Sequence, residues 1–249
     1  MEDNKFLNSP GFATVVEKYS HFLVEVKRRI IFTLIIFILA TVSGFFFYES
    51  IIRFLISLLS LGKTNIVFTS PFQFINLAIS CGVATGVIVI IPILIFQILF
   101  FLKPALKRKE FKWVLRALPF SILLFLIGFI FGAMIMKWQI EIFLDKSTSL
   151  GIGNVLDISS LLSMILLTSV LMGIGFQFPI ILLTLLRLGV ITHQQLSRKR
   201  QWVYLGSFIF AIFLPPDSII ADVVLSMPFI LSFEITLLVN RIMERRKKS

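Results

Sequence analysis

The sequence predicts an all-α membrane protein, a single polytopic domain over residues 1–249 with six transmembrane helices. First, 57% of the residues are hydrophobic, whereas soluble domains contain about 45–50%. Second, most apolar residues fall in long runs without charge, near the ~20 residues that a bilayer core requires. Third, the Lys and Arg residues lie between these runs, so the net charge of +11 indicates membrane topology rather than nucleic-acid binding.

The chain begins with a mostly polar arm, residues 1–29, that leads into a first span over 30–48. The end of the arm reads YSHFLVEVKRRI, with apolar residues at helical spacing. This spacing favours an amphipathic helix that lies against the membrane before the span begins.

Residues 49–73 are expected on the outer side of the membrane. Their first part, SIIRFLISLLSL, is amphipathic and too short to cross, which predicts an interfacial or capping helix. The second span, 74–102, is longer than a crossing requires. Pro92 inside it removes one helical hydrogen bond and predicts a kink. A basic loop over 103–116 follows.

The third span, 117–136, carries Gly128 and Gly132 at the four-residue spacing that permits close helix contact. Residues 137–157 are expected to form a second external loop. The fourth span, 159–186, contains an internal proline and is also predicted to be kinked.

The last two spans, 203–214 and 218–233, are short and flank a Pro-Pro-Asp turn. A twelve-residue helix reaches about 18 Å, less than the ~30 Å of a bilayer core. The sequence therefore predicts a short final hairpin whose outer turn lies below the outer surface, shielded by neighbouring spans or by a thinned bilayer. The tail, 241–249, is basic.

The distribution of positive charge predicts the orientation. The predicted inner segments hold five, six, four and five Lys or Arg residues, and the outer segments hold two, two and none. Because cytoplasmic loops are enriched in Lys and Arg, both termini are expected in the cytoplasm.

No residue pattern indicates an enzyme. The two histidines, His21 and His193, lie in predicted cytoplasmic segments, and the single cysteine, Cys81, lies in an apolar run. No Cys/His metal spacing and no Gly-rich phosphate loop occur. We therefore predict no catalytic residue, no metal site and no cofactor.

Two carboxylates stand in basic stretches at the predicted inner face, Glu25 in VEVKRRI and Glu110 in KRKEFKW. Each could form only a local ion pair, which is worth about 0–1 kcal/mol at an exposed site. Alternatively, the two acids receive a cationic ligand, since guanidinium groups bind carboxylates through two parallel hydrogen bonds.

Few polar residues lie in or beside the predicted spans, and four stand out: Gln97, Gln177, Asp217 and Asp222. Polar groups in a membrane usually face the protein interior or a cavity. The glutamines could therefore form helix–helix hydrogen bonds or mark a surface where a partner docks. Asp217 belongs to the hairpin turn, and Asp222, five residues later, could lie near the external water.

Taken together, these motifs resemble the TatC family, the multispanning receptor core of the twin-arginine protein translocase. The resemblance covers about residues 20–240. It is carried by FLVEVKRRI at 22–30, TSP at 69–71, Pro92 with Gln97, FFLKPALKRKE at 100–110, GFQFP at 175–179, RKRQW at 198–202, LPPD at 214–217, Pro228, and Phe233-Glu234.

The resemblance implies a receptor for signal peptides with adjacent arginines on folded cargo. The family's two key acids fall on Glu25 and Glu110, its aromatic in the second span on Phe101, and its polar residue in the fourth span on Gln177. Lys27 stands where the family usually has arginine, which removes the planar fork of donors.

The resemblance also implies partners and a location. TatA- or TatB-type single-span subunits would meet the polar position in the fourth span, membrane lipids would surround the chain, and the subunit would self-associate in a larger complex. Export would use the proton motive force, across a bacterial cytoplasmic membrane or a plastid thylakoid membrane. The alternative is an ion-coupled transporter of small solutes, which Pro-interrupted spans with intramembrane polar residues would also suit.

Overall fold

The structure is a computed structural model of the chain. Its backbone is described over residues 10–59, 66–67, 70–101, 108–151, 156–187, 189–215 and 218–248. Its side chains are described over residues 24–57, 70–97, 119–151, 156–187, 189–215 and 218–243.

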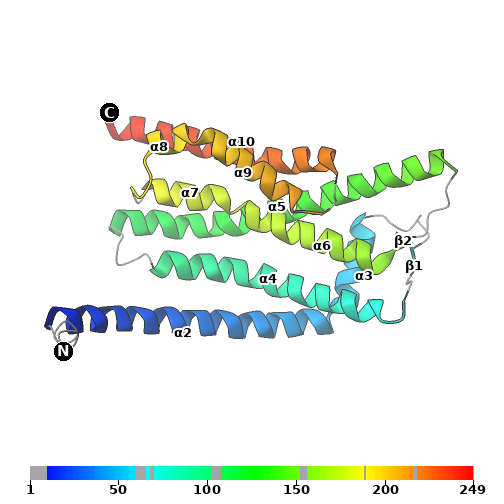
Figure 1. Ribbon diagram of the computed structural model, residues 1–249, viewed down its shortest axis with the longest axis horizontal. Helices are drawn as coiled ribbons and strands as arrows, with labels where there is room; N and C mark the ends of the chain where they lie inside the picture. The colour runs from blue at the N-terminus through cyan, green and yellow to red at the C-terminus, as the bar shows by residue number, and fades with distance from the viewer. Residues whose placement is uncertain are drawn as a thin grey trace, which may run out of the picture.

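The described chain is almost entirely helical, and the long helices lie side by side in alternating directions (Figure 1). The helices are α2 (Pro10–Phe46), α3 (Tyr48–Leu59), α4 (Gln73–Phe101), α5 (Arg108–Ser149), α6 (Ile158–Gly175), α7 (Phe178–Arg187), α8 (His193–Arg198), α9 (Arg200–Ile212) and α10 (Ile219–Lys248).

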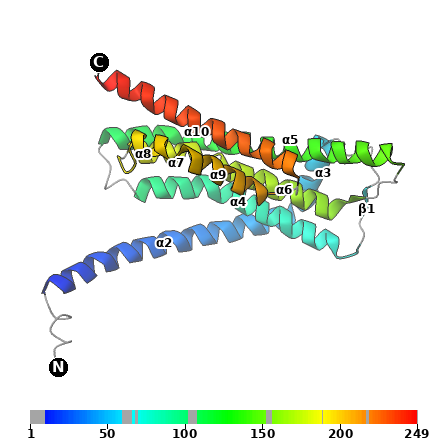
Figure 2. The same ribbon diagram turned by 45° about the horizontal axis from the view of Figure 1, so that its top comes forward.

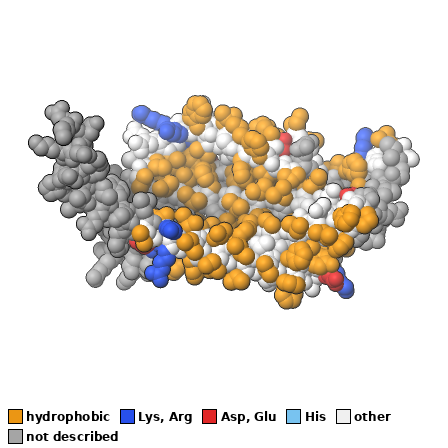
Figure 3. All heavy atoms as spheres, turned by 60° about the horizontal axis from the view of Figure 1, so that its bottom comes forward, with side chains coloured by type: hydrophobic (Ala, Val, Ile, Leu, Met, Phe, Trp, Pro, Cys, Tyr) orange, Lys and Arg blue, Asp and Glu red, His pale blue; other side chains and the backbone are white. Residues whose placement is uncertain are grey.

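Five segments of the described chain are long and apolar enough to cross a membrane: Val24–Phe46, Gln73–Gln97, Pro119–Ser149, Ile158–Arg187 and Ile219–Met243. Figure 3 shows hydrophobic side chains over the middle of the molecule, with most visible charged side chains toward its two ends. This distribution is the one that a bilayer core between two aqueous phases requires. The remaining predicted span corresponds to α9, which has only 13 residues.

The first helix differs from the expectation of a separate interfacial helix before the span. α2 is one continuous helix of 37 residues, so the basic arm runs directly into the membrane span. No glycine or proline interrupts the sequence between Gly11 and Gly44, and nothing therefore breaks the helix at the predicted boundary. α2 diverges from the rest of the bundle toward its N-terminal end (Figure 2).

Close contact between α2 and α4 depends on small residues. A Cβ atom at Gly82 would lie 2.8 Å from the carbonyl oxygen of Thr41, and one at Gly86 would lie within van der Waals overlap of the Thr41 side chain. Small residues let membrane helices approach through their backbones. α2 is thus packed closely against α4 in its C-terminal half, while its N-terminal end stands apart from the bundle (Figure 2).

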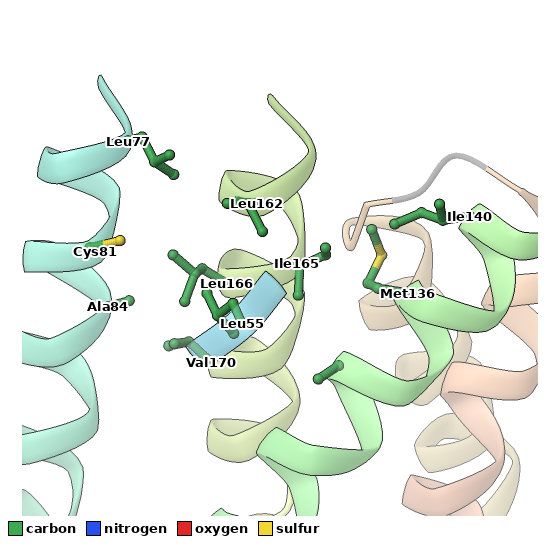
Figure 4. Close-up of a cluster of buried hydrophobic side chains, with 11 residues drawn as sticks. Leu55, Leu77, Cys81, Ala84, Met136, Ile140, Leu162, Ile165, Leu166 and Val170 are labelled. Carbon is green, nitrogen blue, oxygen red and sulfur yellow. The ribbon is translucent and has the colours of Figure 1, made fainter. Parts of the chain in front are cut away.

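The end of the bundle opposite the N-terminus is anchored by α3 and by a small strand pair (Figure 1). α3 is the short amphipathic helix that the sequence predicts, and its Leu55 is buried in a cluster with residues of α4, α5 and α6 such as Cys81 and Ile165 (Figure 4). The strands β1 (Ile66–Val67) and β2 (Leu156–Asp157) pair in parallel.

α5 and α6 pack closely through the predicted glycine pair. A Cβ atom at Gly132 would lie 2.8 Å from the Cα atom of Ser169, and one at Gly128 would lie 2.7 Å from the carbonyl oxygen of Met172. α5 continues to Ser149, thirteen residues beyond the predicted end of the third span. The expected external loop over 137–157 is therefore mostly helix.

The two spans that the sequence predicts to be kinked differ from each other. α4 is a single unbroken helix with Pro92 inside it, and the kink there remains a prediction. The fourth span is divided: α6 ends at Gly175 and α7 begins at Phe178, just before Pro179. Pro179 therefore lies in the first turn of a helix, where its missing N–H costs no hydrogen bond.

The final hairpin is short in one arm only. α9 matches the prediction, but α10 has 30 residues instead of the sixteen expected for 218–233. The predicted span ended at Phe233, just before Glu234, which in the structure accepts a hydrogen bond of 2.6 Å from the Tyr204 hydroxyl and lies 3.4 Å from Arg200. A paired carboxylate does not end the helix.

The first part of the turn between α9 and α10 contacts α6, and the depth of this turn in the membrane remains a prediction. The Thr168 hydroxyl donates to the Pro215 carbonyl at 2.7 Å, and Leu214 is 1% exposed. Thr168 lies ten residues into α6, about 15 Å along the helix axis. The neighbouring span therefore covers part of this turn, although Phe213 beside it is 79% exposed.

Candidate functional site

One end of the bundle gathers the basic residues, and we call it the basic end. It holds the N-terminal part of α2, the end of α4, the starts of α5 and α9, and the end of α10 (Figure 1). The Lys and Arg residues at this end whose side chains are described are Lys27, Arg28, Arg29, Arg187, Arg198, Lys199, Arg200 and Arg241. The opposite end mixes both signs, with Glu49, Arg53, Lys137, Glu141, Asp145, Lys146 and Asp157.

Glu25 lies on the α2 surface that faces α4 at the basic end. Its side chain is 46% exposed and forms an ion pair with Arg29, whose Nη2 and Nε atoms donate to Glu25 Oε1 at 2.6 and 3.2 Å. The four-residue spacing places both side chains on one face of the helix. The carboxylate is therefore held at the surface, within reach of a ligand.

A groove of about 370 Å³ runs between α2 and α4 beside this ion pair. Its lining combines charged and aromatic groups: Glu25, Arg28, Arg29, Phe32, Ile93, Phe96 and Gln97. A second, more apolar groove of about 500 Å³ shares Arg29 and Gln97 with the first and extends along α2 to Phe37. Together the grooves offer a carboxylate at one end and apolar surface beyond it.

The other predicted signal-peptide residues are only partly placed. The backbone of residue 110 belongs to the first turn of α5, and residue 101 ends α4, both at the basic end (Figure 1). The side chains of Phe101 and Glu110 lie outside the described residues, so their meeting with Glu25 remains a prediction. Lys27 is exposed and does not line either groove.

Gln97 connects the two helices that form the grooves. Its side-chain oxygen accepts a hydrogen bond of 2.9 Å from the Thr33 hydroxyl, and its backbone carbonyl accepts one of 3.2 Å from Arg29 Nη1. Gln97 thus forms a helix–helix contact, which was one of the two alternatives for the intramembrane glutamines.

Gln177 lies at the break between α6 and α7 and is 3% exposed. Its side-chain oxygen accepts from the Ser121 hydroxyl at 2.5 Å, and its amide nitrogen donates to the carbonyls of Ser121 and Gly173 at 3.1 and 3.3 Å. Gln177 therefore also forms an internal helix–helix contact, between α5 and the broken fourth span.

The structure describes only one of the two aspartates that the sequence analysis selected near the final hairpin turn. Asp222 lies in the first turn of α10 and is buried, at 8% exposure, rather than facing water. A carboxylate at that position is stabilised by the partial positive charge of the helix N-terminus. Asp217 lies outside the described residues.

Two contacts at the basic end were missed by the sequence analysis. The four-residue spacing of Glu25 and Arg29 could have indicated their ion pair, but the cluster of Arg200, Tyr204 and Glu234 joins different helices. This cluster links the RKRQW and Phe233-Glu234 motifs and is supported by an edge contact between the rings of Tyr204 and Phe233.

The apolar helices and the charged ends define an integral membrane protein. The sequence matches the family "Sec-independent protein translocase protein (TatC)" over residues 21–228. The chain therefore belongs to the TatC family, whose members are named as components of a protein translocase and have a transport role.

Relatives and solved structures agree with this assignment. TatCy of Bacillus subtilis (strain 168) is 27% identical over 90% of this chain and 89% of the relative. TatC of Aquifex aeolicus (strain VF5) is 28% identical over 90% and 95%, respectively. The fold is similar to the crystal structure of the twin arginine translocase receptor TatC in DDM, with a TM-score of 0.78, 26% identity and coverage of 88% of this chain and 98% of that one.

Proposed function

We propose that this chain is the signal-peptide receptor and core subunit of a twin-arginine translocase. The observation that carries the proposal is the exposed Glu25 carboxylate at the mouth of an apolar, aromatic groove. A signal peptide with paired arginines ahead of an apolar stretch has the complementary chemistry. The related structure is named a twin arginine translocase receptor, which supports the same role here.

In this proposal the guanidinium groups of the peptide bind Glu25 and Glu110. Guanidinium pairs with a carboxylate through two parallel hydrogen bonds, which an ammonium group cannot form. The apolar stretch of the peptide lies along Phe32 and Phe96. We expect Phe101, the last residue of α4, to contact the same stretch. Lys27 contributes positive charge that disfavours poorly oriented cations.

The remaining features of the proposal concern topology and assembly. Six spans with both termini in the cytoplasm place the basic end inside, in a bacterial cytoplasmic membrane or a thylakoid membrane. TatA- or TatB-type partners dock from within the bilayer, the proton motive force supplies the energy, and several copies associate. Because the Gln177 amide is bonded to Ser121 and Gly173, it acts by shaping the α6–α7 break that a partner meets.

The test is binding of a fluorescent peptide to the purified full chain in detergent. We expect the arginine-pair peptide to bind at least tenfold more tightly than its lysine-pair version. E25Q is expected to weaken binding of the arginine-pair peptide by about 10- to 100-fold, since hydrogen bonds to charged groups are worth about 1.5–3 kcal/mol. E110Q is expected to have a comparable effect.

The matched control is E49Q. Glu49 is also an exposed acid with an arginine four residues later, Arg53, but it lies at the opposite end of the bundle. E49Q should leave binding unchanged. Equal affinity for the two peptides, or a loss in E49Q as large as in E25Q, contradicts the proposal. Uptake of a small solute by proteoliposomes containing this chain alone would instead favour the transporter alternative.

A further inference from the structure

The receptor carboxylate already holds a guanidinium group of its own chain. Arg29 directs two donors, Nη2 and Nε, to Glu25 Oε1. These are the donor atoms and the acceptor that an arginine of a bound peptide would use. While Arg29 keeps its present position, a peptide arginine therefore cannot form two parallel hydrogen bonds with the Glu25 carboxylate.

Arg29 also has a second anchor that does not involve Glu25. Its Nη1 atom donates to the carbonyl of Gln97 at 3.2 Å, next to the hydrogen bond between Thr33 and the Gln97 side chain. The Arg29 side chain is 25% exposed, about half the exposure of Glu25. If the ion pair opens, the guanidinium keeps a partner at the wall of the groove and does not have to leave the site.

We propose that Arg29 is an internal competitor that occupies the guanidinium site of Glu25 until a peptide arginine displaces it. This inference rests on the proposed function, because it assumes that Glu25 binds the peptide. When only a fraction of the receptor is open, the apparent affinity is lowered by that fraction. Arg29 therefore lowers the apparent affinity of the receptor, so that only a peptide whose arginine binds Glu25 strongly enough to displace Arg29 will bind.

Arg28 provides a matched comparison. It is adjacent in sequence, lines the same groove and carries the same charge, but it forms no ion pair within the described part of the chain. Replacing either arginine with glutamine removes one positive charge from the groove. Only removal of Arg29 also frees the Glu25 carboxylate, so the difference between the two variants isolates the competition.

The experiment measures the affinity of the arginine-pair peptide for full-length R29Q, R28Q, E25Q and the double variant E25Q/R29Q. An exposed ion pair of this kind is weak, so it lowers the fraction of receptor with an open Glu25 by only a small factor. We therefore expect R29Q to bind the peptide roughly two- to sixfold more tightly than R28Q. In the E25Q background, the R29Q change should produce no such gain, because there is no carboxylate left to release.

The possible results separate the two proposals. If E25Q binds as well as the wild-type chain, the receptor role of Glu25 fails. If E25Q weakens binding but R29Q binds no better than R28Q, only the competitor role fails, and a loss in R29Q would show that Arg29 orients Glu25 instead. R29K, which retains the charge but not the paired donors, should give a smaller gain and covers the case in which R29Q is unstable.

Discussion

At the residue scale, some buried polar groups, such as Ser169 and Thr184, bond to carbonyls of their own helix, whereas others bond to partners from other helices. Gln177 shows this most clearly, because both ends of its amide are used between α5 and the broken fourth span. Two of its three hydrogen bonds join Ser121 of α5, and the third joins Gly173 of its own span, so the side chain fixes the relative position of the helices. This residue therefore contributes to the fold independently of any contact with a partner.

Replacement of Gln177 by leucine is expected to lower the free energy of unfolding by about 1–2 kcal/mol. The change leaves the Ser121 hydroxyl without its partner and removes hydrogen bonds that average somewhat below 1 kcal/mol each in membrane proteins. The measurement is denaturant-induced unfolding in detergent. S121A should cost less, because Gln177 keeps two carbonyl partners, and wild-type stability in Q177L would contradict this interpretation.

At the element scale, pairs of helices are held by glycines whose missing side chains leave room for a neighbouring backbone. Gly132 on α5 faces the α6 backbone at Ser169, whereas a Cβ atom added at Gly206 on α9 would meet no heavy atom within 4 Å. Both glycines lie within helices, so they share the same propensity effect and differ in packing alone.

Substitution of Gly132 by alanine is therefore expected to destabilise the protein by about 1–3 kcal/mol, since the added methyl group must push α5 away from α6. The same change at Gly206 should be neutral or stabilise by up to about 1 kcal/mol through helix propensity. Thermal unfolding of the two variants, measured side by side, tests the difference. Equal stabilities would show that the α5–α6 contact is looser than the structure indicates.

The elements show what could be predicted from the sequence and what could not. The apolar runs located the helices, and the Pro-Pro turn indicated the short α9, because local composition determines both features. The lengths of α5 and α10 were underestimated, since the predicted spans stopped just before Lys137 and Glu234. In the structure Lys137 lies 4.0 Å from Glu141, and Glu234 pairs with Arg200, so neither charge stops its helix.

The candidate site, too, could be predicted only in part from the sequence. Glu25 could be selected from its position in a basic stretch, and its partner Arg29 could have been selected from helical spacing. The partners of Gln97 and Gln177 lie 64 and 56 residues away, at Thr33 and Ser121. Such pairs depend on how the helices pack, and no local pattern reports them.

At the scale of the whole molecule, the uneven charge of the two ends predicts its orientation. Among the described side chains, the basic end has eight Lys or Arg residues against Glu25 and Glu234, while the opposite end has nearly equal numbers of both signs. Positively charged segments are retained in the cytoplasm, so the basic end should face inward. All proposed contacts with a cytoplasmic signal peptide require this orientation.

Cysteine labelling in whole cells tests this orientation directly. Cys81 is fully buried, so new cysteines can be introduced at exposed positions with little background from the native residue. A cysteine at Leu150, at the opposite end, should react with a membrane-impermeant maleimide on intact cells, whereas one at Gln194 in α8 should react only after the membrane is opened. C81S controls for residual labelling. The reverse pattern would place Glu25 outside the cell, where a signal peptide in the cytoplasm could not reach it.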